Sequence, residues 1–274
     1  VGTNSLQNAT TASNNTAVGM SALTANTTGD FHVAIGGNAL ASNTTGRYSV
    51  AVGRNASNSQ TTVNGTVAIG YRALEANTTG ENLAVGTNSL LANTTASNNT
   101  AIGLYAMQYN TTGASNVAVG SSALDSNTTA SNNTAVGYNS LTANTTGADN
   151  TAIGYEGMKA STTGADNTSV GYQSLYDNST GSFNASFGHR ALFNNTTASN
   201  NTAVGTSALY TNTTGHENSA LGRNSLLANT TGVHNTGTGD SVLGSNTTGS
   251  QNTAFGSAAL YANTTASNNT AVGY

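Results

Sequence analysis

The sequence predicts an all-β protein: a parallel β-solenoid (β-roll) with one 17-residue coil per repeat and two short strands per coil. The first observation is a glycine that recurs every 17 residues, with a single interval of 16 between Gly70 and Gly86. The second is a pair of large apolar positions and the third a corner of Asn, Thr and Gly, and both keep a constant phase relative to the glycine. Self-similarity at a fixed period is typical of stacked repeat arrays and not of globular enzymes. The repeated glycines, called ladder glycines below, are Gly2, Gly19, Gly36, Gly53, Gly70, Gly86, Gly103, Gly120, Gly137, Gly154, Gly171, Gly188, Gly205, Gly222, Gly239, Gly256 and Gly273.

The two predicted strands are illustrated by the repeat that runs from Tyr138 to Gly154. Its large apolar residues, Leu141 and Ile153, are spaced 12 and 5 residues apart around the cycle, whereas an amphipathic helix needs spacings of three and four. We therefore expect strands at residues 139–143 and 150–154, joined by the ladder glycine at one corner and by Asn-Thr-Thr-Gly at the other. Equivalent residues would stack about 4.8 Å apart in parallel, in-register ladders.

Two ladders of large apolar side chains are expected to fill the interior. The position four residues after the glycine is Leu or Met in every coil except at Ser57. The position just before the glycine is Val, Ile, Leu or Phe except at Thr238. Identical Asn and Thr residues one coil apart are expected to satisfy each other's hydrogen bonds along the array.

The residue two before each ladder glycine is small, usually Ala, as at Ala17 and Ala34. Because side chains alternate along a strand, we expect it to point away from the Val or Ile beside it. A small residue in every coil would let another surface approach closely, most simply a second and third copy of the same rod. The alternative is that Ala lies inward at a tight corner of a single-chain solenoid. We favour the first interpretation, which predicts that the isolated chain is not a stable monomer.

The most regular polar feature is the Asn-Thr-Thr or Asn-Ser-Thr corner, predicted to be exposed. It fits the N-x-[ST] pattern of glycosylation acceptors, and the alternative is a stacked polar turn in which Asn and Thr cap the backbone. Both interpretations stay open at this point. The asparagines concerned are Asn26, Asn43, Asn77, Asn93, Asn110, Asn127, Asn144, Asn178, Asn195, Asn212, Asn229, Asn246 and Asn263.

Composition argues against several classes of function. The chain has only 6 Lys and Arg and 10 Asp and Glu, with a net charge of −4 and no run of either sign, so it offers no basic stripe for a nucleic acid. It has no Cys, hence no thiolate chemistry, and no apolar stretch long enough for a membrane span. The acidic residues lie at variable positions of the cycle, so no pair of carboxylates is expected in a pocket. We expect neither an enzyme nor a bound cofactor or metal.

Histidines, tyrosines and threonines supply the remaining candidates for a site. The histidines are His32, His189, His216 and His234. They occupy different positions of the cycle, so we expect isolated, exposed imidazoles and not a repeated metal site. Tyr138, Tyr155 and Tyr172 are one repeat apart and would stack into a ladder, either as a strip that contacts sugars or simply as packing. The second Thr of the corner, present from Thr11 to Thr265, raises the less favoured possibility of an ice-binding lattice.

The segment Asn-Thr-Ala-Val-Gly-Tyr-Asn-Ser-Leu, residues 133–141, resembles the head repeats of trimeric autotransporter adhesins, which carry a similar signature of small residues and Ala-Ile/Val-Gly. The whole array is also similar to the Asn-Thr-Ala-Ile-Gly and Asn-Thr-Thr-Gly arrays of bacterial and phage tail-fibre-domain proteins. This resemblance implies a homotrimer of left-handed parallel β-rolls. The repeat here is longer than that of the adhesin heads, with the excess in the Asn-Thr-Thr-Gly corner.

From these observations we expect a structural protein of the cell or virion surface. Residues 1–274 are interpreted as a single array of about 16 coils, a window of a longer fibre. The expected function is an extracellular fibre or adhesin shaft without catalysis, and its expected partners are further copies of itself, as a homotrimer or end to end, with glycans or a cell-surface receptor as possible additions. The alternatives are a phage tail-fibre shaft and, less favoured, an ice-binding solenoid.

Overall fold

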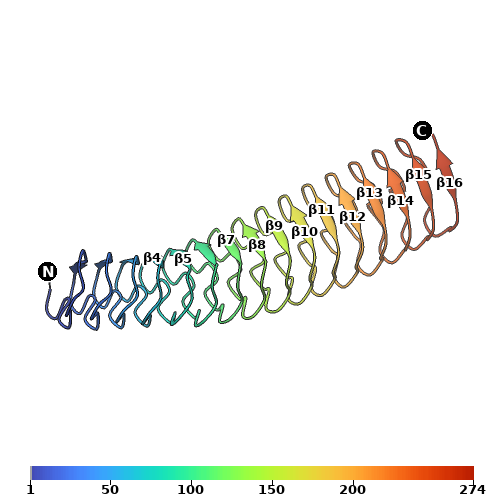
Figure 1. Ribbon diagram of the computed structural model, residues 1–274. Helices are drawn as coiled ribbons and strands as arrows, with labels where there is room; N and C mark the ends of the chain where they lie inside the picture. Colours follow the sequence, from blue (N-terminus) through green and yellow to red (C-terminus); the bar gives the residue numbers. More distant parts are fainter. Residues whose placement is uncertain (1) are drawn as a thin grey trace. The chain divides into compact units, whose positions relative to one another are not determined.

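The computed structural model describes residues 2–274, which contain strands and turns but no helix. The chain divides into two compact units, Val1–Asn133 and Thr134–Tyr274. Each unit is a parallel β-solenoid with 17-residue coils, as predicted, and each coil contributes one three-residue strand (Figure 1). The two units together contain about 15 turns.

Neighbouring strands within each unit pair in parallel and in register. Val33, Ala34 and Ile35 pair with Val50, Ala51 and Val52 in the first unit, and the second unit repeats this pattern throughout. The strands of the first unit are β1 (Thr16–Val18), β2 (Val33–Ile35), β3 (Val50–Val52), β4 (Val67–Ile69), β5 (Leu83–Val85), β6 (Thr100–Ile102) and β7 (Val117–Val119). Those of the second are β8 (Thr134–Val136), β9 (Thr151–Ile153), β10 (Thr168–Val170), β11 (Ala185–Phe187), β12 (Thr202–Val204), β13 (Ser219–Leu221), β14 (Thr236–Thr238), β15 (Thr253–Phe255) and β16 (Thr270–Val272).

The prediction of a second strand in each coil is wrong. In the repeat 138–154, Asn139 and Leu141 have left-handed backbones, with φ of 52° and 51°, and a strand does not contain such residues. The N–H of Ser140 donates to the carbonyl of Gly137 (3.4 Å), and the N–H of Asn144 donates to that of Leu141 (3.2 Å). The segment is therefore two consecutive tight turns, which place Leu141 inside the coil as a strand would have done.

The ladder glycines are required by close stacking of the coils. Gly103 has φ of +140°, a region that side-chain-bearing residues rarely adopt, and a Cβ atom there would overlap the carbonyl oxygen of Gly120. The same close approach recurs along each unit. Glycine is therefore needed both for its backbone conformation and for its lack of a side chain.

The interior confirms one predicted ladder and contradicts the other. Leu23 and Leu40, from the ladder after the glycine, are fully buried. The Val and Ile ladder is not in the core: Ile35 is 40% exposed, whereas Ala34 beside it is fully buried. Ala therefore lies inward, as the alternative held, and this position beside the buried Leu holds only small side chains, since Ser169 and Ser186 are also fully buried there. The larger β-branched residues consequently face outward.

The single 16-residue interval is absorbed at a corner without loss of register. A regular corner has two residues between its glycine or alanine and the next Asn, and the second is left-handed, as at Asp149 (φ 58°). The short coil has only Glu81 at this point and no left-handed residue. Ile69 still pairs with Val85, so the deletion removes a turn residue and leaves the strand ladder intact.

Candidate functional site

The asparagines of the Asn-Thr-Thr corner are buried, contrary to the exposed position that the sequence predicted. Twelve have fully buried side chains, and only Asn263, in the last coil, is partly exposed. The buried members are Asn26, Asn43, Asn77, Asn93, Asn110, Asn127, Asn144, Asn178, Asn195, Asn212, Asn229 and Asn246.

Hydrogen bonds explain why these amides lie inside. Asn110 Nδ2 donates both to Oδ1 of Asn93 in the preceding coil (3.0 Å) and to the carbonyl of Gly113 in its own corner (2.9 Å). A second ladder of Asn lies just before the strands and pairs in a related way. Asn116 is also buried, and its backbone N–H donates to Oδ1 of Asn99 (2.9 Å). Asn99 Nδ2 also donates to the carbonyl of Gly113 (2.9 Å), so the amides of both ladders bind the backbone of the corner, which is the stacked polar turn that the sequence offered as the alternative.

N-glycosylation of the corner asparagines therefore stays an untested hypothesis that the folded chain does not favour. An oligosaccharide is attached through Nδ2, and in Asn110 both hydrogens of this atom are used inside the protein. Asn263 differs because its side chain is partly exposed, although its Nδ2 also donates to Asn246 and Ala266.

The outward side of the strands forms an exposed apolar face in the first unit. Each strand contributes its first and third residues, while its middle Ala points inward. Ile35, Ile69 and Ile102 are 38–40% exposed. Twelve of the fourteen residues on this face are Val, Ile or Leu: Val18, Val33, Ile35, Val50, Val52, Val67, Ile69, Leu83, Val85, Ile102, Val117 and Val119. A parallel sheet is normally covered on both sides, and an exposed apolar patch of this kind marks an interaction surface. We call it the outer strand face.

In the second unit the outer strand face has one apolar and one hydroxyl column. The third residues of the strands remain large and apolar, as at Ile153 and Phe187, except at Thr238. The first residues are Thr or Ser in all strands except at Ala185. The apolar strip on the strands of the second unit is therefore one column wide, whereas that of the first unit is two columns wide.

Two columns of stacked aromatic rings lie on the second unit, and the predicted tyrosine ladder is one of them. Tyr138, Tyr155 and Tyr172 stack with centroids 5.4 and 5.2 Å apart, and His189 continues the column at 5.1 Å. The other column, which the sequence analysis missed, consists of Tyr176, Phe193 and Tyr210, spaced 5.0 and 5.2 Å apart. Its members are 17 residues apart, so the period alone would have identified them.

A polar row separates the two aromatic columns. Gln173 Nε2 donates to a Glu156 carboxylate oxygen (2.9 Å) and Arg190 Nε donates to Gln173 Oε1 (3.0 Å). Burial alone would raise the pKa of Glu156, but hydrogen bonds from Lys159 and Gln173 outweigh it and the pKa lies below its usual value. The guanidinium of Arg190 lies 5.9 Å from the Tyr172 ring and 5.5 Å from the Phe193 ring, so this cation bridges the columns.

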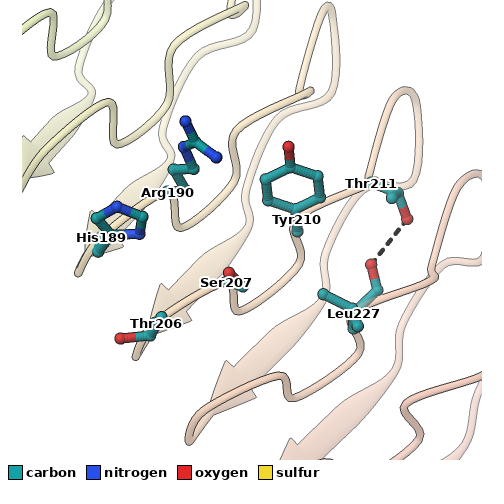
Figure 2. Close-up of a pocket in the computed structure, with 7 residues that line it drawn as sticks. All are labelled: His189, Arg190, Thr206, Ser207, Tyr210, Thr211 and Leu227. Carbon is teal, nitrogen blue, oxygen red and sulfur yellow. Dashed lines mark hydrogen bonds between the residues drawn. The ribbon is translucent and has the colours of Figure 1, made fainter.

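An open groove of about 440 Å³ begins where the aromatic columns end (Figure 2). One repeat after His189 the equivalent residue is Thr206, which has no ring. The face of the imidazole that points away from Tyr172 therefore has no ring stacked on it. Among the other residues of the groove, Thr211 Oγ1 donates to the carbonyl of Leu227 (2.8 Å). The groove is lined by His189, Arg190, Thr206, Ser207, Tyr210, Thr211 and Leu227.

The prediction of four isolated, exposed histidines is wrong: His189 is exposed but stacks on Tyr172, and the other three depart further from it. His32 is buried and takes the place of an Asn in the second asparagine ladder: its Nε2 lies 2.5 Å from the Gly46 carbonyl and its Nδ1 accepts from the N–H of Ser49 (3.2 Å). Burial lowers the pKa of His32. His216 and His234 are exposed but not isolated, because Glu217 contacts both.

No protein-family model, curated protein or solved structure gives a significant match to this chain. Likeness to known proteins therefore rests on the repeat motif alone. Within residues 2–274, no helix is long and apolar enough to cross a membrane.

Proposed function

We propose that this protein is a structural shaft of an extracellular fibre or adhesin, a solenoid that associates side by side with copies of itself and carries no catalytic site. The observation that carries the proposal is the outer strand face. It is continuous over all seven strands of the first unit, and twelve of its fourteen residues are apolar. Such a face favours burial against a partner.

A second copy of the same chain is the partner that this face fits best. The face repeats with every coil, since neighbouring strands pair in strict register. Only a surface with the same period can meet each row of side chains along the whole length, and another copy supplies that period. Three copies around a common axis are what the resemblance to adhesin heads implies. The proposed place of action, outside the cell or on a virion, follows from the same resemblance.

Sedimentation analysis of the whole chain tests this proposal. We expect the wild type to be oligomeric at micromolar concentration and the triple variant Ile35→Thr, Ile69→Thr, Ile102→Thr to dissociate. Burial of each Ile against a partner should contribute about 1–2 kcal/mol, so the three substitutions in one chain should weaken its association by on the order of 10²–10⁴-fold. Thr is chosen because the chain itself uses it at the equivalent Thr238.

The control replaces Tyr138 and Tyr155, which are also exposed but lie off the outer strand face, with Thr. This variant should retain the oligomeric state of the wild type. A wild-type chain that sediments as a folded monomer, or a triple variant that associates as strongly as the wild type, would contradict the proposal. A phage tail-fibre shaft remains the alternative within the same structural class, and the sequence adjoining residues 1–274 in the gene would distinguish it from an adhesin.

A second candidate function is contact with a saccharide at the groove beside His189 and Tyr210. The observation in its favour is the imidazole face that has no stacked ring, next to the Arg190 guanidinium and the hydroxyls of Thr206 and Ser207. Sugars bind to such combinations of an aromatic face and hydrogen-bonding groups. Binding to a glycan array that is lost on Tyr210→Thr would support it, and unchanged binding would not.

Ice binding has less support from the geometry. The first threonine of each corner, such as Thr27, donates its hydroxyl to the carbonyl of the next coil (3.1 Å), so this column is not free to order water. The second, such as Thr28, is exposed but lies in a bend. A thermal-hysteresis measurement separates this alternative from the structural role.

A further inference from the structure

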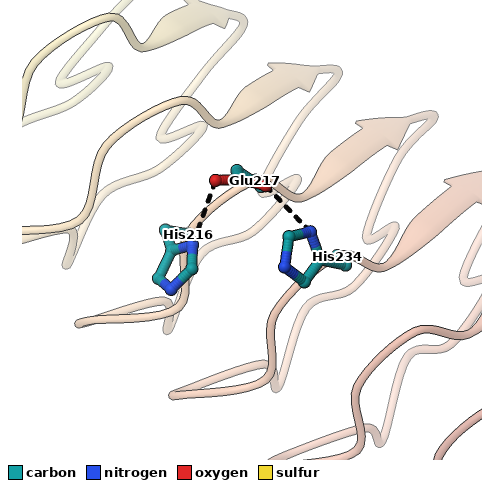
Figure 3. A group of neighbouring side chains, drawn as sticks. All are labelled: His216, Glu217 and His234. Carbon is teal, nitrogen blue, oxygen red and sulfur yellow. Dashed lines mark ion pairs between the residues drawn. The ribbon is translucent and has the colours of Figure 1, made fainter.

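Two histidines and a glutamate gather at one corner of the second unit, apart from the outer strand face and the groove (Figure 3). His216 and Glu217 are neighbours in one coil, and His234 holds the position of Glu217 in the next coil. One possible ligand atom from each of the three residues can be chosen so that all lie within 4.8 Å of one another. His216 and Glu217 are therefore adjacent in sequence, and the stacking of successive coils brings His234 next to them.

The backbone fixes the relative positions of the three residues. The N–H of His234 donates to the carbonyl of His216 (3.2 Å), which ties the two coils together at this point. Glu217 and His234 both have left-handed backbones, with φ of 58° and 56°. Their side chains are about half exposed, so they can adjust around an ion while their Cα atoms stay in place.

Charge and donor chemistry at the corner both favour a cation. The two carboxylate oxygens of Glu217 face the Nδ1 atoms of His216 and His234, at 3.6 and 2.9 Å. The adjacent coils place no charge in this column, because its neighbouring members are Asn200 and Gln251. Two imidazoles with one carboxylate are a ligand set for zinc and related metals, whereas calcium and magnesium prefer oxygen ligands alone.

We propose that His216, Glu217 and His234 form a binding site for one divalent transition-metal ion, for which Zn²⁺ is the probe. Three protein ligands leave a further coordination position for water or for a donor from another molecule. Because the ligands come from two successive coils, the bound ion would link these coils and stabilise the folded chain by mass action. This site is independent of the proposed self-association.

Titration calorimetry of the untagged full chain with ZnCl₂ tests the proposal. We expect one ion per chain and a higher unfolding temperature with Zn²⁺ than without it. His216→Ser and His234→Asn use residues that other coils hold at the same positions, such as Ser199 and Asn200, so the fold should be preserved. Each should weaken binding by at least the roughly 10–100-fold that loss of an outer-shell partner costs.

The matched control is His189→Tyr, which continues the tyrosine column and removes a histidine elsewhere. It should bind Zn²⁺ as the wild type does. Circular dichroism of each variant without metal confirms that it is folded, and the absorption spectrum of bound Co²⁺ reports whether nitrogen ligands are lost. Absence of binding by the wild type, or equal binding by the wild type and His234→Asn, would overturn the proposal.

Discussion

At the scale of single residues, the carboxyl of Asp125 is partly buried without a compensating partner for one of its oxygens. The oxygen concerned is Oδ1, and burial raises the pKa of this carboxyl to about 6. The folded chain therefore binds this proton more tightly than the unfolded chain, whose carboxyl has its ordinary pKa of 3.8. Between pH 3.8 and about 6 the wild type should lose stability as the pH rises, because the unfolded state releases the proton first.

Asp125→Asn should remove the contribution of this carboxyl to the pH dependence. At pH 8 the variant should be more stable than the wild type by about 1–2 kcal/mol, after allowance for partial exposure of the carboxyl. The chain accepts Asn at this position, since Asn58 is the equivalent residue of another coil. Urea unfolding at pH 3.5 and pH 8 is the measurement, with Asp149→Asn, an exposed corner residue, as control. Equal stability of variant and wild type at pH 8 would contradict the assignment.

At the scale of the coil, the sequence predicts the period, the parallel register and the Leu ladder, because these depend only on phase. It does not decide which strand residues face inward. Ala34 and Ile35 alternate, so either could be in the core, and the choice depends on the width left beside the buried Leu, which only the three-dimensional coil defines. The same reason explains the asparagines: a polar corner is normally exposed, but here a second asparagine ladder supplies partners inside.

Some contacts of the candidate surfaces could be predicted from the 17-residue spacing, and others could not. The stacking of Tyr138 with Tyr155 follows from their spacing alone. The approach of His234 to His216 does not, because these residues occupy different positions of the cycle and meet diagonally across two coils. His32 could have been placed by phase, since it stands where other coils have an inward Asn such as Asn99. Its bulk is accommodated because the next coil has the small Ser49 at this position.

Paired substitutions in β6 test the orientation of the strands. Ala101→Leu should destabilise the chain by about 1–3 kcal/mol or more, because the inward position has no room for a larger side chain. Ile102→Val, on the outer strand face, should change the stability of the dissociated chain by less than about 1 kcal/mol. Urea unfolding at a concentration where the chain is dissociated measures both. The reverse order of effects would mean that the Ile, and not the Ala, lies inside.

At the scale of the whole molecule, each coil contacts its immediate neighbours, so stability should grow with the number of coils and not depend on any one of them. The short coil before Gly86 shows what the array tolerates: a residue is lost at a corner, and the strands on either side stay in register. Length is therefore variable in this architecture, whereas phase is not. A shift of phase would place ladder glycines opposite side chains and would break both asparagine ladders.

Deletion of one complete repeat should therefore be tolerated, and deletion of part of one should not. Removal of residues 87–103 joins Gly86 to Leu104 and preserves the phase of every ladder. We expect this variant to keep its β-sheet circular dichroism and its self-association, with a small decrease in the urea midpoint. Removal of residues 87–94 deletes the buried Leu90 and the corner Asn93 but leaves β6 in place. The chain between β5 and β6 is then too short for β6 to pair with β5 while the corners stay stacked. This variant should lose cooperative unfolding. If both deletions had the same effect, the register between neighbouring coils would not be the source of the stability of the array.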